Sequence, residues 1–335
     1  MIPLRVSAQP AFLHQGCIYG SDSEFLAMAV PFVLGGLHAG EPVLVATTPA
    51  NLDLLHDEIG QDAAEVDYVE PEHLGMRPPQ RATAIHRYWS RHQSSTPARA
   101  VRVLAEPEWT GRSAREVSAW QRMEAALNVV LADTRIWMIC PYDTRTVNAG
   151  IVDDARRTHP ECVVGHRVEP SSLFVRPEEF ARSHVEPLPQ GPAEGLFRFE
   201  GDLTAVRRYV LRAAASLLRS DDAATGMFGI AVGEAIAYLD SQGIERAAVW
   251  LRPAADRVVC TLHSDQPLTC VPPFLGYRPP DATREPGDGL WLTNQICEWL
   301  DVTSDASGCT IELAMPGDTA GEMKRAESKR LAFEA

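Results

Sequence analysis

The chain has 335 residues, of which 45% are hydrophobic and 23% charged, and its net charge at pH 7 is −14. One hydrophobic core rarely extends over this length, so we expect about two globular domains. The acidic balance argues against direct nucleic-acid binding, which needs a basic surface. The sequence has no apolar run of about 20 residues that would span a membrane. Residues 1–10 show no signal-peptide pattern, so we expect a cytoplasmic protein.

The first half of the chain alternates between predicted strands and predicted helices. Helix starts are indicated at Ser21 or Asp22, and at Ser113, which forms a capping box with Glu116. The alternation predicts an α/β fold with a mostly parallel sheet that is covered by helices on both faces. The predicted strands occupy residues 42–47, 66–70, 99–107 and 136–143, and the predicted helices occupy residues 23–40, 49–60 and 113–133.

A segment rich in proline and glycine separates this half from the rest of the chain. We therefore predict a first domain over residues 8–184, a linker over 185–196, a second domain over 197–316 and a tail over 317–335. The second domain is predicted to place a helical layer on one face of a mixed sheet. Its expected elements are helices over 202–218 and 222–243, two strands within 246–265, a helix from Gly289 through Leu300, and a strand over 308–316.

The cysteines do not form a recognisable framework. Their number is odd, and none of them lies in a Cys-x-x-Cys pair, so we expect reduced thiols and no disulfide bonds. A zinc site made of clustered cysteines is also not indicated, and we assign no metal-binding residue. The seven cysteines are Cys17, Cys140, Cys162, Cys260, Cys270, Cys297 and Cys309.

The first domain resembles the MEDS sensory domain of methanogen and methylotroph regulators, which has a RecA/KaiC-like fold. The resemblance extends over about residues 10–180, and its most specific pieces are "EPEWTGR" (106–112) and "CPYDT" (140–144). RecA-like proteins bind nucleotide through a P-loop that contains Lys and two glycines. The corresponding "YGSDSEFL" (19–26) has no lysine and only one glycine. We therefore expect no ATP binding in this domain.

Several polar and aromatic residues are predicted near the strand ends of the first domain. In parallel sheets the carboxyl ends of the strands surround the ligand crevice, so we expect these residues to line one pocket for an unknown small organic ligand. His, Cys and Glu are also metal ligands, and a cysteine in such a place can be a redox-responsive thiol. The same residues would also be accounted for by ordinary packing. They are His14, Glu106, Trp109, Cys140 and Tyr142.

The second domain resembles the histidine-kinase-type ATPase fold, an α/β sandwich, in its branch of small anti-sigma-factor serine kinases. The main piece is "GDGLWLTNQICEWLDV" (287–302), followed by Gly308. In that family a Gly-x-Gly loop opens a helix whose N-terminus faces the ATP phosphates, a place where backbone N–H groups favour anions. The resemblance implies that Gly287, Gly289 and Leu290 form this loop and that Glu234 is the catalytic base.

Two family signatures depart from the expected pattern. Tyr238 stands where the family has an asparagine that holds Mg²⁺, and Mg²⁺ prefers compact oxygen ligands. Ser264 stands at the position of the aspartate that binds adenine, and Asp265 is one residue late, on the opposite side of the strand. We therefore expect ATP and Mg²⁺ binding to be weak or lost, as in a pseudokinase.

Three functions are compatible with these observations. The first is a regulator in which the sensory domain controls an anti-sigma-type domain that binds a sigma factor or an anti-anti-sigma protein. This order of the two domains resembles that of actinobacterial anti-sigma-like regulators. The second is an active ATP-dependent serine kinase that uses Glu234. The third is an enzyme that processes a small molecule with Cys140 and His14. The resemblance also implies a possible homodimer, and we expect neither a nucleic-acid nor a membrane partner.

Overall fold

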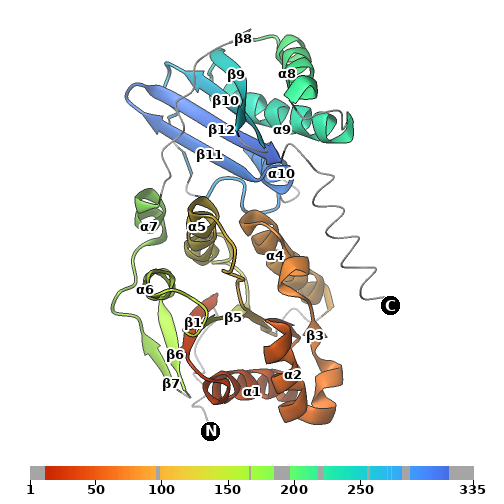
Figure 1. Cartoon of the computed structure of the whole chain (residues 1–335), viewed down its shortest axis with the longest axis vertical. Helices are drawn as coiled ribbons and strands as arrows, with labels where there is room; N and C mark the ends of the chain where they lie inside the picture. Colours follow the sequence, from red (N-terminus) through yellow and green to blue (C-terminus); the bar gives the residue numbers. More distant parts are fainter. Residues whose placement is uncertain are drawn as a thin grey trace. The chain divides into compact units, whose positions relative to one another are not determined.

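The computed structural model describes residues 12–95, 99–165, 167–184, 197–217, 222–254, 257–269, 271–272, 274–280 and 287–316. The chain divides into two compact units, Met1–Glu186 and Pro187–Ala335, which are described separately below (Figure 1). The expected linker at 185–196 and tail at 317–335 lie outside the described residues. Among the described helices, none is both long enough and apolar enough to cross a membrane.

The N-terminal unit contains a seven-stranded sheet in the order β3-β2-β4-β5-β1-β6-β7. Every ladder is parallel except β6–β7, so the expected mostly parallel sheet is confirmed. The strands are β1 (Leu13–Tyr19), β2 (Val43–Ala46), β3 (Asp67–Tyr68), β4 (Val101–Ala105), β5 (Ile136–Asp143), β6 (Glu161–Val164) and β7 (Arg167–Pro170).

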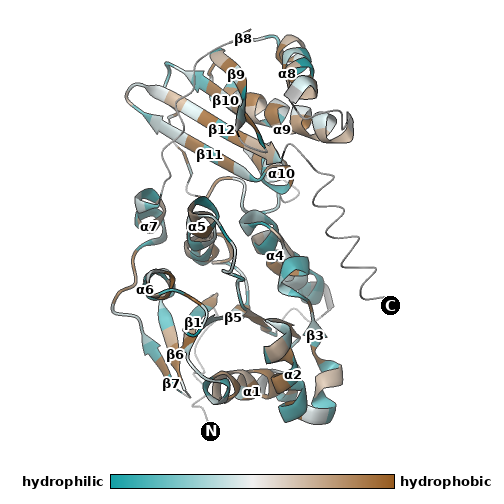
Figure 2. Cartoon of the chain, in the orientation of Figure 1, coloured by the Kyte–Doolittle hydropathy of each residue, from teal (hydrophilic) through white to brown (hydrophobic). Residues whose placement is uncertain are grey.

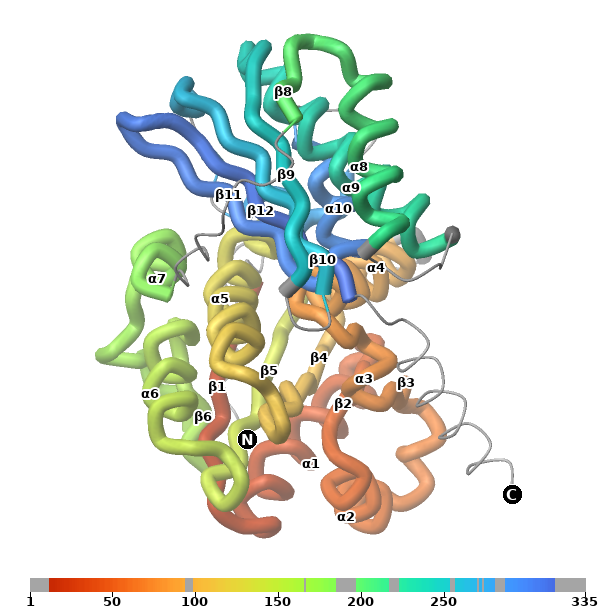
Figure 3. Tube along the Cα trace, turned by 45° about the horizontal axis from the view of Figure 1, so that its top comes forward, coloured from red at the N-terminus to blue at the C-terminus, as the bar shows by residue number. Residues whose placement is uncertain are grey.

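Helices cover both faces of this sheet. Helices α1 and α2 lie on one face, and α4, α5 and α6 lie on the other (Figures 1 and 3). The predicted caps form: Ser21 accepts a hydrogen bond from the backbone N–H of Glu24, and Ser113 and Glu116 make a capping box. The helices are α1 (Asp22–Ala39), α2 (Pro49–Ile59), the 3-10 helix η1 (Gly60–Glu65), α3 (Pro71–Leu74), α4 (Pro78–Ser95), α5 (Ala114–Val130), α6 (Ala149–Thr158) and α7 (Pro177–Ser183).

The C-terminal unit contains a five-stranded sheet in the order β11-β12-β10-β9-β8. All four of its ladders are antiparallel, so the mixed sheet expected from the sequence is wrong. Its elements are β8 (Phe197–Glu200), α8 (Leu203–Leu217), α9 (Asp222–Ser241), β9 (Arg246–Ala254), β10 (Arg257–Ser264), α10 (Asp288–Ile296), β11 (Trp299–Asp305) and β12 (Gly308–Pro316).

The expected helix through Leu300 is shorter than predicted. Helix α10 ends at Ile296, and Leu300 lies in β11, opposite Leu313 of β12. The strand is favoured because β11 and β12 form a hairpin in which Asp305 pairs with Gly308. Bands of hydrophobic colour alternate with paler bands along these strands (Figure 2), as expected for a sheet with one buried face.

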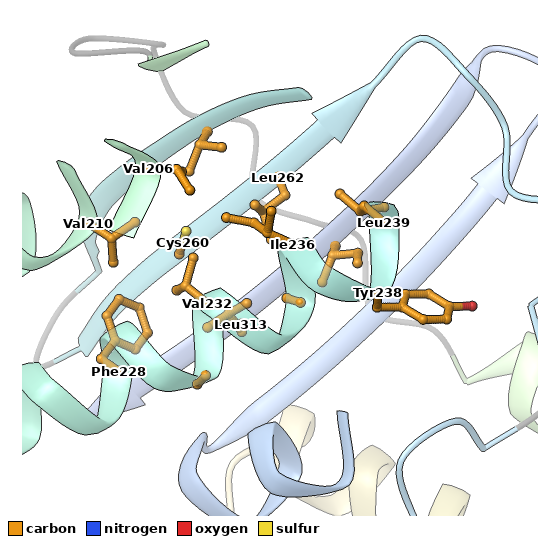
Figure 4. Packing of buried hydrophobic residues seen from close by; sticks show 14 of the residues in the cluster. Val206, Val210, Phe228, Val232, Ile236, Tyr238, Leu239, Cys260, Leu262 and Leu313 are labelled. Atoms are coloured by element: carbon orange, nitrogen blue, oxygen red, sulfur yellow. The ribbon is translucent and has the colours of Figure 1, made fainter. Parts of the chain in front are cut away.

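Helix α9 places one apolar stripe against this sheet. Phe228, Val232, Ile236 and Leu239 are fully or almost fully buried and follow helical spacing (Figure 4). They pack with sheet residues that include Cys260, Leu262 and Leu313. This core fixes the orientation of α9, on which Glu234 and Tyr238 lie.

Candidate functional site

The register between β1 and β5 brings His14 and Cys140 to the same face of the N-terminal sheet. His14 pairs with Met138, and Gly16 pairs with Cys140. Because side chains alternate between the faces of a strand, the side chains of His14 and Cys140 share one face. The Sγ atom of Cys140 lies 3.4 Å from Nε2 of His14. Neither residue lies at the carboxyl end of its strand, where it was expected. His14 is the second residue of β1, and Cys140 lies inside β5.

Two further residues complete a cluster that the sequence did not indicate. Glu124 comes from α5, and His159 is the C-cap of α6. The carboxylate oxygen Oε2 of Glu124 lies 3.3 Å from His14 Nε2, 3.5 Å from His159 Nε2 and 3.4 Å from Cys140 Sγ. The four candidate ligand atoms all lie within 4.8 Å of one another, and all four residues are buried. We call these four residues the His-Glu-Cys cluster.

Hydrogen bonds on the far side of each imidazole fix its orientation. Nδ1 of His159 lies 2.7 Å from the carbonyl oxygen of Ala155, which can only accept, so this nitrogen carries the proton. Nδ1 of His14 lies 3.2 Å from Oδ1 of Asn128. The amide group of Asn128 is itself oriented, because its Nδ2 donates to the carbonyl oxygen of Thr158 at 2.8 Å. Both imidazoles therefore direct Nε2 toward Glu124.

Burial sets the charge of the cluster. Burial, followed by the neighbouring His159, lowers the pKa of His14 to about 4. Burial also raises the pKa of the Cys140 thiol well above its usual value, and the Glu124 carboxylate adds to this effect. For Glu124, burial alone would raise the pKa, but the contacts with His14 and His159 bring it below its usual value. Burial and the mutual contacts of these side chains thus hold the pKa values of His14, Glu124 and Cys140 away from their ordinary values.

The two predicted aromatic residues lie beside this cluster. Tyr142 packs edge-on against His159, with ring centroids 5.7 Å apart. Trp109 stacks on Tyr142 at 6.0 Å. Arg81 of α4 is fully buried near them, and its charge interacts with Glu124 and Cys140. His14, Cys140, Tyr142 and Trp109 are therefore brought together, as one aromatic and polar group.

Glu106 does not join this group. It follows β4, and its carboxylate accepts hydrogen bonds from Tyr19, Thr47 and Asn51, at 3.0 Å from Tyr19 and 3.1 Å from Asn51. Tyr19 packs in the core formed with α1 and α2, on the other face of the sheet. The strand-end argument identified the correct edge for Glu106 but not the face. The residues expected in a single pocket therefore form two separate groups. In the group around Glu106, each carboxylate oxygen accepts a hydrogen bond, as in a structural network.

Glu106 should make the stability of the N-terminal unit depend on pH. Burial raises its pKa above the ordinary 4.5, although its hydrogen bonds act in the opposite direction. At pH values between the ordinary and the raised pKa, Glu106 is protonated in the native state but ionised in the unfolded state. The contribution of Glu106 to the free energy of unfolding therefore falls as pH rises. In urea unfolding from pH 4.5 upward, the advantage of wild type over Glu106→Gln should therefore shrink. A difference in the free energy of unfolding that stays constant across pH would contradict this prediction. Glu108→Gln, at an exposed position, is the control for the loss of one charge.

In the C-terminal unit, residues of the predicted nucleotide site meet at the start of α10. The carboxylate of Glu234 occupies the space that a Cβ atom at Gly289 would take, so it rests directly against this glycine. The ring of Tyr238 lies beside Gly287, 3.4 Å from the position of a Cβ atom there. Gly287 has a φ of 101°, which favours glycine. Leu290 is fully buried and belongs to the core.

The two residues expected at the adenine position face different ways. Ser264 is buried at the end of β10, and its Oγ accepts a hydrogen bond from the backbone N–H of Gln266 at 3.3 Å. The side chain of Asp265 is fully exposed, 3.8 Å from His263. A register slip that would turn Asp265 inward is therefore not observed, because β10 stays paired with β12 up to Ser264.

Glu124 and His159 were missed for a clear reason. Glu124 lies on the buried stripe of a helix whose neighbours Trp120, Met123 and Leu127 are apolar. A single carboxylate within such a stripe is the signal that the sequence offered. His159 directly follows α6, a helix that the sequence analysis did not predict.

Comparison with known protein families identifies the N-terminal unit. Residues 13–160 match the family described as MEDS, the MEthanogen/methylotroph, DcmR Sensory domain. The resemblance of the first domain to this family is thereby confirmed, and it supports a role in sensing and signalling. All four residues of the His-Glu-Cys cluster lie within the matched range. No curated protein matches the chain.

Proposed function

We propose that the protein is a cytoplasmic signalling regulator. Its N-terminal unit senses a chemical signal at the His-Glu-Cys cluster. Its C-terminal unit, which resembles the histidine-kinase-type ATPases of the anti-sigma branch, transmits the signal by binding a sigma factor or an anti-anti-sigma protein. In this proposal the N-terminal unit has a RecA/KaiC-like fold that does not bind ATP.

The observation that supports sensing most strongly is the convergence of four buried ligand groups inside the part of the chain that matches a sensory family. Burying polar and charged groups has a free-energy cost unless partners satisfy them. Apolar residues would pack the same space between β1, β5, α5 and α6 without that cost. A cluster kept at such a cost is a strong candidate for ligand binding.

The start of α10 supports a role in protein binding instead of phosphate transfer. In an active site of this type, the Gly-x-Gly loop receives the phosphates of ATP. Here the Glu234 carboxylate lies against Gly289, and a second anion at this position would be repelled. Tyr238, beside Gly287, offers no compact oxygen ligand for Mg²⁺.

The enzymatic alternatives have less support. A nucleophilic cysteine requires a lowered pKa and access to substrate, whereas Cys140 is fully buried and its pKa is raised. An active serine kinase is favoured only by the closeness of Glu234 to the glycine loop. The acidic chain suits a protein partner with a basic surface, and a homodimer is part of the proposal by resemblance alone.

Calorimetry with ATP and Mg²⁺ separates a pseudokinase from a kinase. We expect no saturable heat from the whole chain at ATP concentrations up to about 1 mM, which corresponds to a binding free energy weaker than about −4 kcal/mol. Glu234→Gln removes the repelling charge with little change of shape, so any ATP binding should increase in this variant. Micromolar binding by the wild type that Gly289→Ala abolishes would instead establish a nucleotide site and favour the kinase.

The regulatory proposal is tested with purified partners. The whole chain is titrated against sigma factors and anti-anti-sigma proteins of the source genome, with wild type and with Cys140→Ser. We expect one of them to bind, and its affinity to differ between the two forms of the protein. Binding that is identical in both forms would show that the His-Glu-Cys cluster does not control the C-terminal unit.

A further inference from the structure

We propose that His14, Glu124, Cys140 and His159 form a site for one tetrahedrally coordinated divalent transition metal ion, and that Zn²⁺ suits it best. The inference deepens the sensory function proposed above, since it names the class of ligand that the cluster takes. It stands on the geometry of the four side chains, and metal binding can be measured without any knowledge of the partner.

The spacing of the donor atoms fits a tetrahedral ion. Zn²⁺ binds N, O and S ligands at about 2.0–2.3 Å, so the ligand atoms of a tetrahedral site lie about 3.3–3.6 Å from one another. The four separations that involve Glu124 Oε2 or the Cys140–His14 pair are 3.3, 3.4, 3.4 and 3.5 Å. Four of the six separations therefore match a tetrahedral site, and the other two are no longer than 4.8 Å.

The orientation of the imidazoles fits the same interpretation. Metal-binding histidines usually donate their other ring N–H to a carbonyl, an amide or a carboxylate, which directs the free lone pair at the metal. His159 donates from Nδ1 to the Ala155 carbonyl, and His14 donates from Nδ1 to the oriented amide of Asn128. In both residues Nε2 remains available as a ligand.

Without a cation, the centre of the cluster is poorly satisfied. Two Nε2 atoms face the same oxygen of Glu124, and an imidazole nitrogen whose ring proton sits on Nδ1 accepts hydrogen bonds but does not donate them. A single proton would relieve only one of these two contacts. Among the described residues, His159 Nε2 and Glu124 Oε1 are buried and make no hydrogen bond. One divalent cation would satisfy both nitrogens and the carboxylate together.

The types of ligand select the metal. Ca²⁺ and Mg²⁺ bind oxygen atoms almost exclusively, whereas two imidazoles, one thiolate and one carboxylate suit Zn²⁺ and its spectroscopic substitute Co²⁺. Binding requires loss of the Cys140 proton, so the ion replaces a neutral thiol by a metal-bound thiolate. The resulting site has four protein ligands, from β1, α5, β5 and the end of α6, and it would link these elements.

The backbone of β1 at Gly16 lies close against the ring of His159. A Cβ atom at Gly16 would lie 3.2 Å from Cγ of His159, closer than ordinary van der Waals contact. The ring of His14 lies against the ring of His159, with centroids 4.1 Å apart. Gly16 is therefore a positioning residue for the site, since its lack of a side chain allows His159 to approach β1.

Cobalt titration of the whole chain is the test. The purified protein is stripped of metal with a chelator and titrated with Co²⁺, and its absorption spectrum is recorded. We expect one equivalent of Co²⁺ to produce the intense visible bands of tetrahedral cobalt and a thiolate-to-cobalt charge-transfer band in the near ultraviolet. One equivalent of Zn²⁺ should remove both.

Variants show whether the ion occupies this site. In Cys140→Ser the charge-transfer band should disappear, and in Asn128→Ala the affinity should fall about 10–100-fold, as for other outer-shell partners. Cys17→Ser is the matched control. Cys17 is buried like Cys140, but it lies in β1 and packs on the opposite face of the sheet. Circular dichroism of each variant shows whether it is folded.

The outcomes separate this inference from the proposed function. Absence of the tetrahedral spectrum in folded wild type overturns the metal site, as does a charge-transfer band that persists in Cys140→Ser and is lost in Cys17→Ser. Neither result bears on partner binding by the C-terminal unit. Conversely, a cobalt site that leaves the affinity for every partner unchanged supports the metal site and contradicts the regulatory proposal.

Discussion

Addition of Zn²⁺ at about a hundred times its dissociation constant should stabilise the folded N-terminal unit by about 2.7 kcal/mol, because the ion binds the folded state only. For a unit of this size, the midpoint of thermal unfolding should rise by roughly 5–10 °C. The unfolded chain does not bind the ion at this site, because the four ligands come from separate elements, β1, α5, β5 and the end of α6. Differential scanning calorimetry of the whole chain, with Zn²⁺ or with a chelator, measures the shift.

Cys140→Ser is the decisive variant for this prediction. It removes the sulfur ligand and changes one atom, so the rise caused by Zn²⁺ should be much smaller. Cys17→Ser should keep the full rise, although it destabilises the same sheet. If Zn²⁺ shifts wild type and Cys140→Ser equally, the ion acts elsewhere on the protein and the His-Glu-Cys cluster is not its site.

Phe228→Ala should destabilise the C-terminal unit by about 3–5 kcal/mol, the usual cost of removing a buried phenyl ring. Phe228 is fully buried where α9 packs on the sheet, beside Val232 and Val210 (Figure 4). For a unit of this length the midpoint should fall by roughly 10 °C or more. Because the chain divides into two compact units at Glu186, we expect two transitions in calorimetry, of which only one moves.

The neighbouring residue supplies the control for this prediction. Met227 lies in the same helix but is 42% exposed, so Met227→Ala should change the stability by about 0.5 kcal/mol or less. The Zn²⁺-dependent transition should be the same in both variants. A shift of both transitions in Phe228→Ala would show that the two units unfold as one cooperative body.

The sequence predicted best those elements whose pattern is local. The strand over residues 136–143 agrees with β5 to the residue, and the capping box of Ser113 and Glu116 marks the start of α5. In these cases the burial pattern or the helix cap is determined by adjacent residues. Helix α4 was not predicted, because its sequence is rich in Arg, His and Gln, which separate the buried Ala82, Ile85 and Tyr88.

Elements that depend on distant partners were predicted less well. The spacing of Leu292, Ile296 and Leu300 suits a helix, but Leu300 pairs with Leu313 in a hairpin. Similarly, the position of Glu106 at a strand end was predictable, whereas its face depends on the register with which its strand joins the sheet. Register is a property of the assembled sheet, and one residue of shift turns every side chain to the other face.

The candidate site was only half predictable for the same reason. His14 and Cys140 were expected to line one pocket of the first domain, and the pairing of β1 with β5 does bring them together. Glu124 and His159 reach the cluster through the packing of α5 and α6 on the sheet. No local pattern announces that packing, and a carboxylate within an apolar stripe was the only indication.

X-ray absorption at the zinc edge of the whole chain, loaded with one equivalent of Zn²⁺, tests the central claim most directly. We expect a four-coordinate ion with one sulfur at about 2.3 Å and three nitrogen or oxygen atoms at about 2.0–2.2 Å, with the outer-shell scattering of two imidazoles. In Cys140→Ser the sulfur contribution should disappear. A six-coordinate shell of light atoms alone, identical in wild type and Cys140→Ser, would contradict the assignment of the His-Glu-Cys cluster as a metal site.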